Sequence, residues 1–130
     1  MSSLFALIVE DTKDIANYFS LALKTAGFQT EVILTGDAAL ERLKTVVPDI
    51  VVLDLHLPEV MGTEILRAIR ADARLANTQV IVITADALTA ETIQDKADLV
   101  LIKPVGLDQL GDLATRLTRD RAEGKELDFQ

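Results

Sequence analysis

Two short apolar runs constrain the fold of this chain more than any other feature. Residues 50–53 read Ile-Val-Val-Leu and residues 80–83 read Val-Ile-Val-Ile, with no polar residue inside either run. β-Branched residues favour strands, and strands without polar alternation are typical of sheets that are covered on both faces. Both runs therefore predict buried strands of a parallel sheet.

Further strand and helix patterns alternate along the chain. Shorter strand patterns lie at residues 4–9, 30–34 and 99–102. The expected helices run from Ile15 to Ala26, from Gly36 to Pro48, around residues 65–69, from Thr89 to Lys96 and from Leu107 to Leu117. Asp11 or Thr12 is expected to cap the first helix, and Gly27 to end it with a positive φ. This alternation predicts an α/β fold, a single doubly wound parallel sheet with helices on both faces.

Composition limits the class of protein. The chain has 130 residues, enough for one domain with a buried core, and 49% of them are hydrophobic. The net charge of −8 argues against direct binding of nucleic acid or of an anionic membrane surface. Cysteine is absent, and no apolar run resembles a signal peptide or a membrane span. We expect a cytoplasmic domain over residues 1–118, with residues 119–130 as a polar tail or the start of a linker.

Polar side chains follow four of the predicted strands. Glu10 and Asp11 follow the first strand, Asp54 ends the third, Thr84 follows the fourth and Lys103 follows the fifth. The carboxyl ends of parallel strands meet at one edge of the sheet, where open α/β folds bind ligands. We therefore expect these side chains to converge. Each also has a simpler explanation alone, as a turn residue, a helix cap, a strand end or a solvated lysine.

Three converging carboxylates repel one another unless a cation neutralises them. Mg²⁺ prefers oxygen ligands of this kind. Lys103 offers a positive charge suited to a phosphate oxygen, and Thr84 offers a hydroxyl group. Together these groups are suited to a phosphoryl group on Asp54.

The same residues resemble the receiver domain of bacterial two-component response regulators, in the CheY-like superfamily. The resemblance covers about residues 4–118. Its motifs are Val9-Glu10-Asp11, the segment 51–58 with Gly62 after it, Thr84-Ala85 and Lys103-Pro104. It implies a flavodoxin-like sheet of five strands in the order 2-1-3-4-5.

The resemblance implies that Asp54 accepts a phosphoryl group from a phosphohistidine on a sensor histidine kinase or a histidine phosphotransfer protein. It implies Mg²⁺ as the cofactor, bound by Asp11, Asp54 and the backbone carbonyl of His56 with support from Glu10. Such a domain is a signalling switch rather than an enzyme, because it catalyses only its own phosphorylation and dephosphorylation. Receiver domains often form homodimers, and the sequence does not decide whether this chain forms one.

The resemblance also assigns the switch. Lys103 would pair with the phosphoryl oxygens, and its peptide bond to Pro104 is expected to be cis. Thr84 would bind the phosphoryl group and draw its loop inward, and the small Ala85 would leave room for this movement.

Two positions match sites that tune the lifetime of the phosphoaspartate, His56 and Asp86. One position departs from the family: Val100 stands where an aromatic residue usually couples to the threonine. The span between Thr84 and Lys103 is also short, with residues 96–98 replacing the usual Gly-Ala pair. The departures leave the phosphorylation chemistry intact but put the usual signal transmission in doubt.

Two other functions stay open. Because of Val100 and the short fourth helix, one alternative is an interaction module that has the receiver fold but signals without phosphorylation. A phosphatase with an aspartyl nucleophile, as in the haloacid dehalogenase-like group, would need a second acid two residues after Asp54, where this chain has His56.

Overall fold

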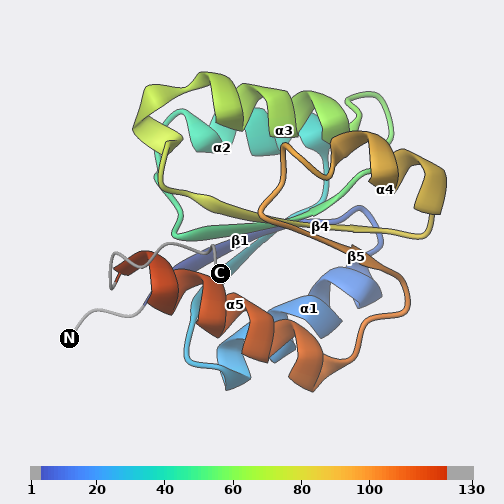
Figure 1. The fold of residues 1–130 in the computed structure, drawn as a ribbon. Helices are drawn as coiled ribbons and strands as arrows, with labels where there is room; N and C mark the ends of the chain where they lie inside the picture. The colour runs from blue at the N-terminus through green and yellow to red at the C-terminus, as the bar shows by residue number, and fades with distance from the viewer. Residues whose placement is uncertain (1–3, 123–130) are drawn as a thin grey trace.

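A parallel sheet forms the middle layer of the structure, a computed structural model that describes residues 4–122 (Figure 1). Its five strands are β1 (Phe5–Val9), β2 (Gln29–Ile33), β3 (Ile50–Asp54), β4 (Gln79–Thr84) and β5 (Leu99–Ile102). They lie in the order β2-β1-β3-β4-β5, and each neighbouring pair is parallel. The predicted flavodoxin-like fold is confirmed.

Helices cover both faces of this sheet. They are α1 (Lys13–Thr25), α2 (Gly36–Leu43), α3 (Gly62–Ala71), α4 (Ala87–Ile93) and α5 (Leu107–Ala122), with a 3₁₀ helix, η1 (Ala73–Leu75), after α3. α1 and α5 lie below the sheet in Figure 1, whereas α2, α3 and α4 lie above it. Among the described residues, no helix has the length and apolar character needed to cross a membrane.

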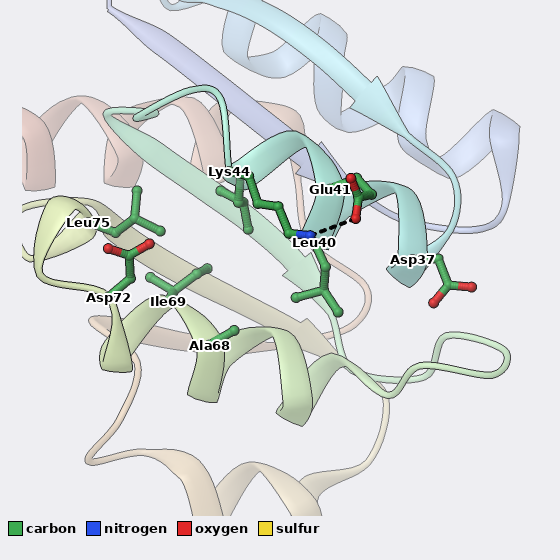
Figure 2. A pocket seen from close by; sticks show the side chains of 9 residues that line it. Asp37, Leu40, Glu41, Lys44, Ala68, Ile69, Asp72 and Leu75 are labelled. Atoms are coloured by element: carbon green, nitrogen blue, oxygen red, sulfur yellow. Dashed lines mark hydrogen bonds and ion pairs between the residues drawn. The ribbon is translucent and has the colours of Figure 1, made fainter.

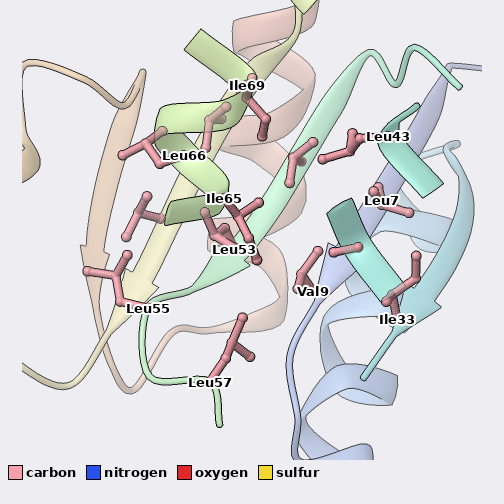
Figure 3. Close-up of a cluster of buried hydrophobic side chains, with 14 of the residues drawn as sticks. Leu7, Val9, Ile33, Leu43, Leu53, Leu55, Leu57, Ile65, Leu66 and Ile69 are labelled. Carbon is pink, nitrogen blue, oxygen red and sulfur yellow. The ribbon is translucent and has the colours of Figure 1, made fainter. Parts of the chain in front are cut away.

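The apolar strands are buried because each supplies side chains to both layers. Alternate residues of a strand point to opposite faces of the sheet. In β3, Leu53 packs toward α2 and α3 with Ile65 and Ile69 (Figure 3), whereas Val52 packs with the α1 and α5 side chains. Burial of one such side chain stabilises the fold by about 1.5–3 kcal/mol. The uniform apolar pattern follows from this two-sided burial.

The ends of α1 differ in how well the sequence predicted them. Gly27 has a φ of +103°, as expected after the end of this helix. Thr12 occupies the N-cap position but makes no side-chain capping bond, so the predicted cap was wrong. The carboxylate of Glu10 instead accepts the backbone N–H of Thr12 at 3.1 Å.

Three other helix ends were predicted imprecisely. α2 ends at Leu43, before Pro48, where the Arg74 guanidinium donates to the Leu43 carbonyl at 2.6 Å. α4 runs earlier than residues 89–96, because the Asp86 carboxylate accepts the N–H groups of Leu88 and Thr89. α5 continues to residue 122, past the expected end of the domain at 118. The domain boundary itself stays a prediction, and residues 123–130 lie outside the described residues.

Candidate functional site

Three carboxylates meet at the carboxyl edge of the sheet. Glu10 and Asp11 follow β1 and Asp54 ends β3, and one oxygen from each lies within 4.8 Å of the others. β1 and β3 are paired neighbours, which brings these strand ends together. Glu10 and Asp54 are only 1% and 4% exposed, whereas Asp11 is exposed. The cluster therefore opens to solvent on the Asp11 side.

The Asp54 carboxylate has a defined partner on each oxygen. Its Oδ1 accepts the backbone N–H of His56 at 3.1 Å, and its Oδ2 lies 3.6 Å from Nζ of Lys103. Gly62 packs directly behind it. A Cβ atom on Gly62 would lie 2.5 Å from Cα of Leu55 and still closer to the Asp54 carbonyl oxygen. Only glycine permits this approach.

Lys103 connects the two buried acids. Its Nζ lies 3.3 Å from Oε1 of Glu10, and its side chain is 26% exposed. Burial raises the pKa of Glu10 to about 7, and the negative charge of Asp54 adds to the rise. The Thr12 N–H and the Lys103 charge act in the opposite direction. The peptide bond between Lys103 and Pro104 is cis, the isomer expected from the resemblance.

The β4 end contributes a hydroxyl group. Thr84 is fully buried, and its Oγ1 accepts the backbone N–H of Asp86 at 3.0 Å. Ala85 is exposed. Nε2 of His56 lies 3.8 Å from Oδ2 of Asp86, so the loops after β3 and β4 approach each other. Hydrogen bonds from the hydroxyl and the N–H of Thr89 lower the pKa of Asp86, and the Leu88 N–H and His56 add to this effect.

Comparison with known proteins agrees with this geometry. The family model of the response regulator receiver domain matches residues 6–115. The chain belongs to this family. It is 31% identical over 125 residues to the DNA-binding response regulator MtrA of Mycolicibacterium smegmatis. The aligned region covers 93% of this chain and 54% of that protein. It is 32% identical to the response regulator ArlR of Staphylococcus saprophyticus, over 80% of this chain and 47% of that protein.

Solved structures agree as well. The receiver domain from Methylobacillus flagellatus superposes with a TM-score of 0.81 and 26% identity, covering 89% of this chain and 99% of that one. This chain therefore matches a whole receiver domain. It spans about half the length of the curated relatives MtrA and ArlR.

The acidic cluster of this receiver domain fits a magnesium ion. Carboxylate oxygens are the hard ligands that Mg²⁺ prefers, and the cation usually keeps several waters beside one or two carboxylates. Glu10 and Asp54 are buried and mutually repulsive, so a cation beside the exposed Asp11 would offset their charge. The described residues thus provide ligands of the expected kind.

Val100 packs within the receiver domain's core. It is half-buried and contacts the hydrophobic cluster on the α2, α3 and α4 side, to which Ile93 of α4 belongs. The usual aromatic side chain is therefore replaced by a smaller residue beside α4.

A groove of about 430 Å³ lies between α2 and α3, apart from this site (Figure 2). Leu40 and Ile69 line its apolar part, and the exposed pair of Lys44 and Glu41 lies at its rim, 2.8 Å apart. None of the three clustered carboxylates lines it. The groove is therefore separate from the acidic cluster.

Two interactions were not predicted from the sequence. Lys103 and Glu10 were expected to converge at the sheet edge, but not to form a direct ion pair across 93 positions of sequence. Arg70 is exposed on α3, and its guanidinium also binds three residues in two other segments of the chain. No local sequence pattern indicates either contact.

Proposed function

We propose that this receiver domain is a phosphorylation-controlled switch in which Asp54 accepts a phosphoryl group. One observation carries the proposal: the Asp54 carboxylate is fixed by the His56 N–H on one oxygen and faces Lys103 on the other. The partly exposed amine beside it offers a ready partner for phosphoryl oxygens. Glu10 and Asp11 complete an acidic cluster suited to the cation that phosphoryl transfer requires.

The transfer would use the Asp54 carboxylate as nucleophile. One oxygen attacks the phosphorus of a phosphohistidine, so that an O–P bond forms while the N–P bond to the imidazole breaks. The released imidazole nitrogen takes up a proton from solvent. Mg²⁺, held by Glu10, Asp11 and Asp54 with the His56 carbonyl, would offset the negative charge of the transferred group. Lys103 would contribute a second positive charge.

The structural response would begin at Thr84. Its hydroxyl oxygen now accepts the N–H of Asp86, and it would instead turn to donate to a phosphoryl oxygen. The β4–α4 loop would then move toward Asp54, and the small side chain of Ala85 would not obstruct this movement. His56 and Asp86, which approach each other beside the cluster, would set how fast water removes the phosphoryl group.

The phosphodonor would be a sensor histidine kinase or a histidine phosphotransfer protein in the cytoplasm. The relative MtrA is named as a DNA-binding response regulator, but this chain matches only about half of that protein. We propose that this domain does not itself bind DNA, because its net charge of −8 would be repelled by the DNA phosphates. It would act instead by contact with other proteins or with a second copy.

Intact mass spectrometry tests the proposal. The 130-residue protein would be incubated with acetyl phosphate, with Mg²⁺ or with a chelator. We expect a gain of one phosphoryl group that needs Mg²⁺ and is absent in Asp54→Asn. Asp112→Asn, which changes an exposed carboxylate on α5, serves as the matched control and should be modified like the wild type. A gain that persists in Asp54→Asn would refute the proposal.

Val100 favours a second candidate, an interaction module that signals without phosphorylation. The two candidates differ in their response to Mg²⁺. The switch predicts a saturable change in NMR or fluorescence on Mg²⁺ titration, weakened in Asp11→Ala. A protein that shows no such change would favour the second candidate. Multiple turnover of a phosphate ester, lost in Asp54→Asn, would instead favour the phosphatase.

A further inference from the structure

Arg70, near the end of α3, binds three residues in two other segments of the chain, the turn before β4 and the stretch before β5. Its Nε donates to the carbonyl oxygen of Lys96 at 2.7 Å, and its Nη1 donates to that of Thr78 at 3.3 Å. Its Nη2 donates to the carboxylate of Asp98 at 2.8 Å. These four residues form the Arg70 network. A planar guanidinium can donate in several fixed directions at once, which the ammonium group of a lysine would not reproduce.

The Arg70 network fixes the start of β5. Oδ2 of Asp98 also accepts the backbone N–H of Val80 at 2.7 Å, and the Asp98 N–H donates to the Val80 carbonyl at 2.9 Å. These bonds precede the first paired residues of β4 and β5, Ile81 and Leu99. They therefore set the register of a short strand that leads directly to Lys103.

The opposite end of α4 is held differently. The Asp86 N–H donates to Oγ1 of Thr84, the same hydroxyl group that the proposed switch would redirect. Within α4 only Ala90 and Ile93 are buried, and Leu88 is 77% exposed. α4 thus begins at a bond that phosphorylation would break and is followed by a segment that the Arg70 network fixes to α3 and β4.

We infer that Arg70 is a positioning residue that confines the conformational change to residues 85–95. This inference rests on the proposed function and adds a boundary to it. Movement of Thr84 would displace the loop and α4, whereas the chain from Lys96 onward, with β5 and Lys103, would stay in place. Val100 lies beyond this boundary, so the change would not require an aromatic side chain at that position.

Backbone amide NMR of the full chain tests the boundary, with and without acetyl phosphate and Mg²⁺, while intact mass is followed in parallel. In the wild type, amides of residues 85–95 should shift on phosphorylation and those of residues 97–101 should not. In Arg70→Ala, the shifts should spread into residues 97–101. Hydrogen-exchange protection of the Val80 and Asp98 amides should also fall, by roughly tenfold.

Matched variants separate the geometry of Arg70 from its charge. Arg67→Ala changes an exposed arginine on the same helix that makes no side-chain hydrogen bond or ion pair within residues 4–122, and it should behave like the wild type. Arg70→Lys keeps the charge and should behave like Arg70→Ala. Asp98→Asn probes the same network should Arg70→Ala fail to fold, and it should also let the shifts spread.

The outcomes are distinct. A wild type that gains the phosphoryl mass but shifts equally in residues 85–95 and 97–101 would overturn the inference and leave the proposed function intact. Unchanged protection and unchanged shifts in Arg70→Ala or Asp98→Asn would overturn it as well. A wild type that gains no mass would refute the proposed function and, with it, this inference.

Discussion

The two halves of the site differ in how firmly the fold holds them. On the β1–β3 side, the strands that carry Glu10 and Asp54 are almost wholly buried. On the α4 side, only Ala90 and Ile93 of the helix are buried, and Leu88 is 77% exposed. Local opening costs least where few apolar contacts are made. The difference indicates that the chemistry is placed on the firm half and the movement on the looser half.

Truncation of one core side chain in each half should show this difference most strongly. Leu53→Ala removes a fully buried side chain of β3, and we expect the free energy of unfolding to fall by about 2–5 kcal/mol. Ile93→Ala, in α4, should cost about 2 kcal/mol or less, since a short surface helix can repack around the loss. Urea unfolding measures both. Equal losses would contradict the comparison.

The buried Glu10 should make the stability of the firm half depend on pH. The pKa of Glu10 is about 7 in the folded protein against an ordinary value of 4.5, so the folded state retains this proton more strongly. Stability without metal should therefore fall as pH rises from about 4.5 to about 7. Glu10→Gln should remove this loss, on the order of 1–3 kcal/mol. Urea unfolding across this pH range, in the presence of a chelator, measures the free energy of unfolding of both proteins. Parallel pH curves for the wild type and Glu10→Gln would contradict the raised pKa of Glu10.

Gly62 tests how closely the firm half is packed behind Asp54. Gly62→Ala would drive a methyl group into the backbone at Leu55, and it should lower the free energy of unfolding by about 1–3 kcal/mol and slow phosphorylation. Gly106→Ala is the control, because the added Cβ atom would lie 4.0 Å from Cβ of Gln109, an ordinary van der Waals contact. A stable and normally phosphorylated Gly62→Ala protein would show that this packing is dispensable.

The cap of α4 should give the smallest effect. Hydrogen bonds from Thr89 lower the pKa of Asp86, so its contribution is present above the ordinary value of 3.8 and is lost as pH falls through the lower, folded value. Asp86→Ala should shift the urea midpoint slightly at pH 7, and the shift should shrink in acid. A shift as large as that of Leu53→Ala would mean that α4 is held as firmly as the core.

The firm half was the more predictable from the sequence. Two-sided burial leaves an uninterrupted apolar run, as in residues 80–83, so strand type and order followed from local patterns and the resemblance. The placement of acids just after β1 and at the end of β3 followed from the same argument.

Contacts between distant segments could not be predicted in the same way. α2 ends early where Arg74, 31 residues after Leu43, binds the carbonyl oxygen of Leu43. The Arg74 side chain reaches this position only in the finished fold. α4 begins early for a local reason, because Asp86 directly precedes the helix and caps it.

Chemical trapping of the phosphorylated residue tests the central claim most directly. After incubation with acetyl phosphate and Mg²⁺, borohydride reduces an aspartyl phosphate to homoserine, which peptide mass spectrometry then locates. We expect homoserine at position 54 alone. Homoserine at another position, or a phosphoryl group on His56, would contradict it.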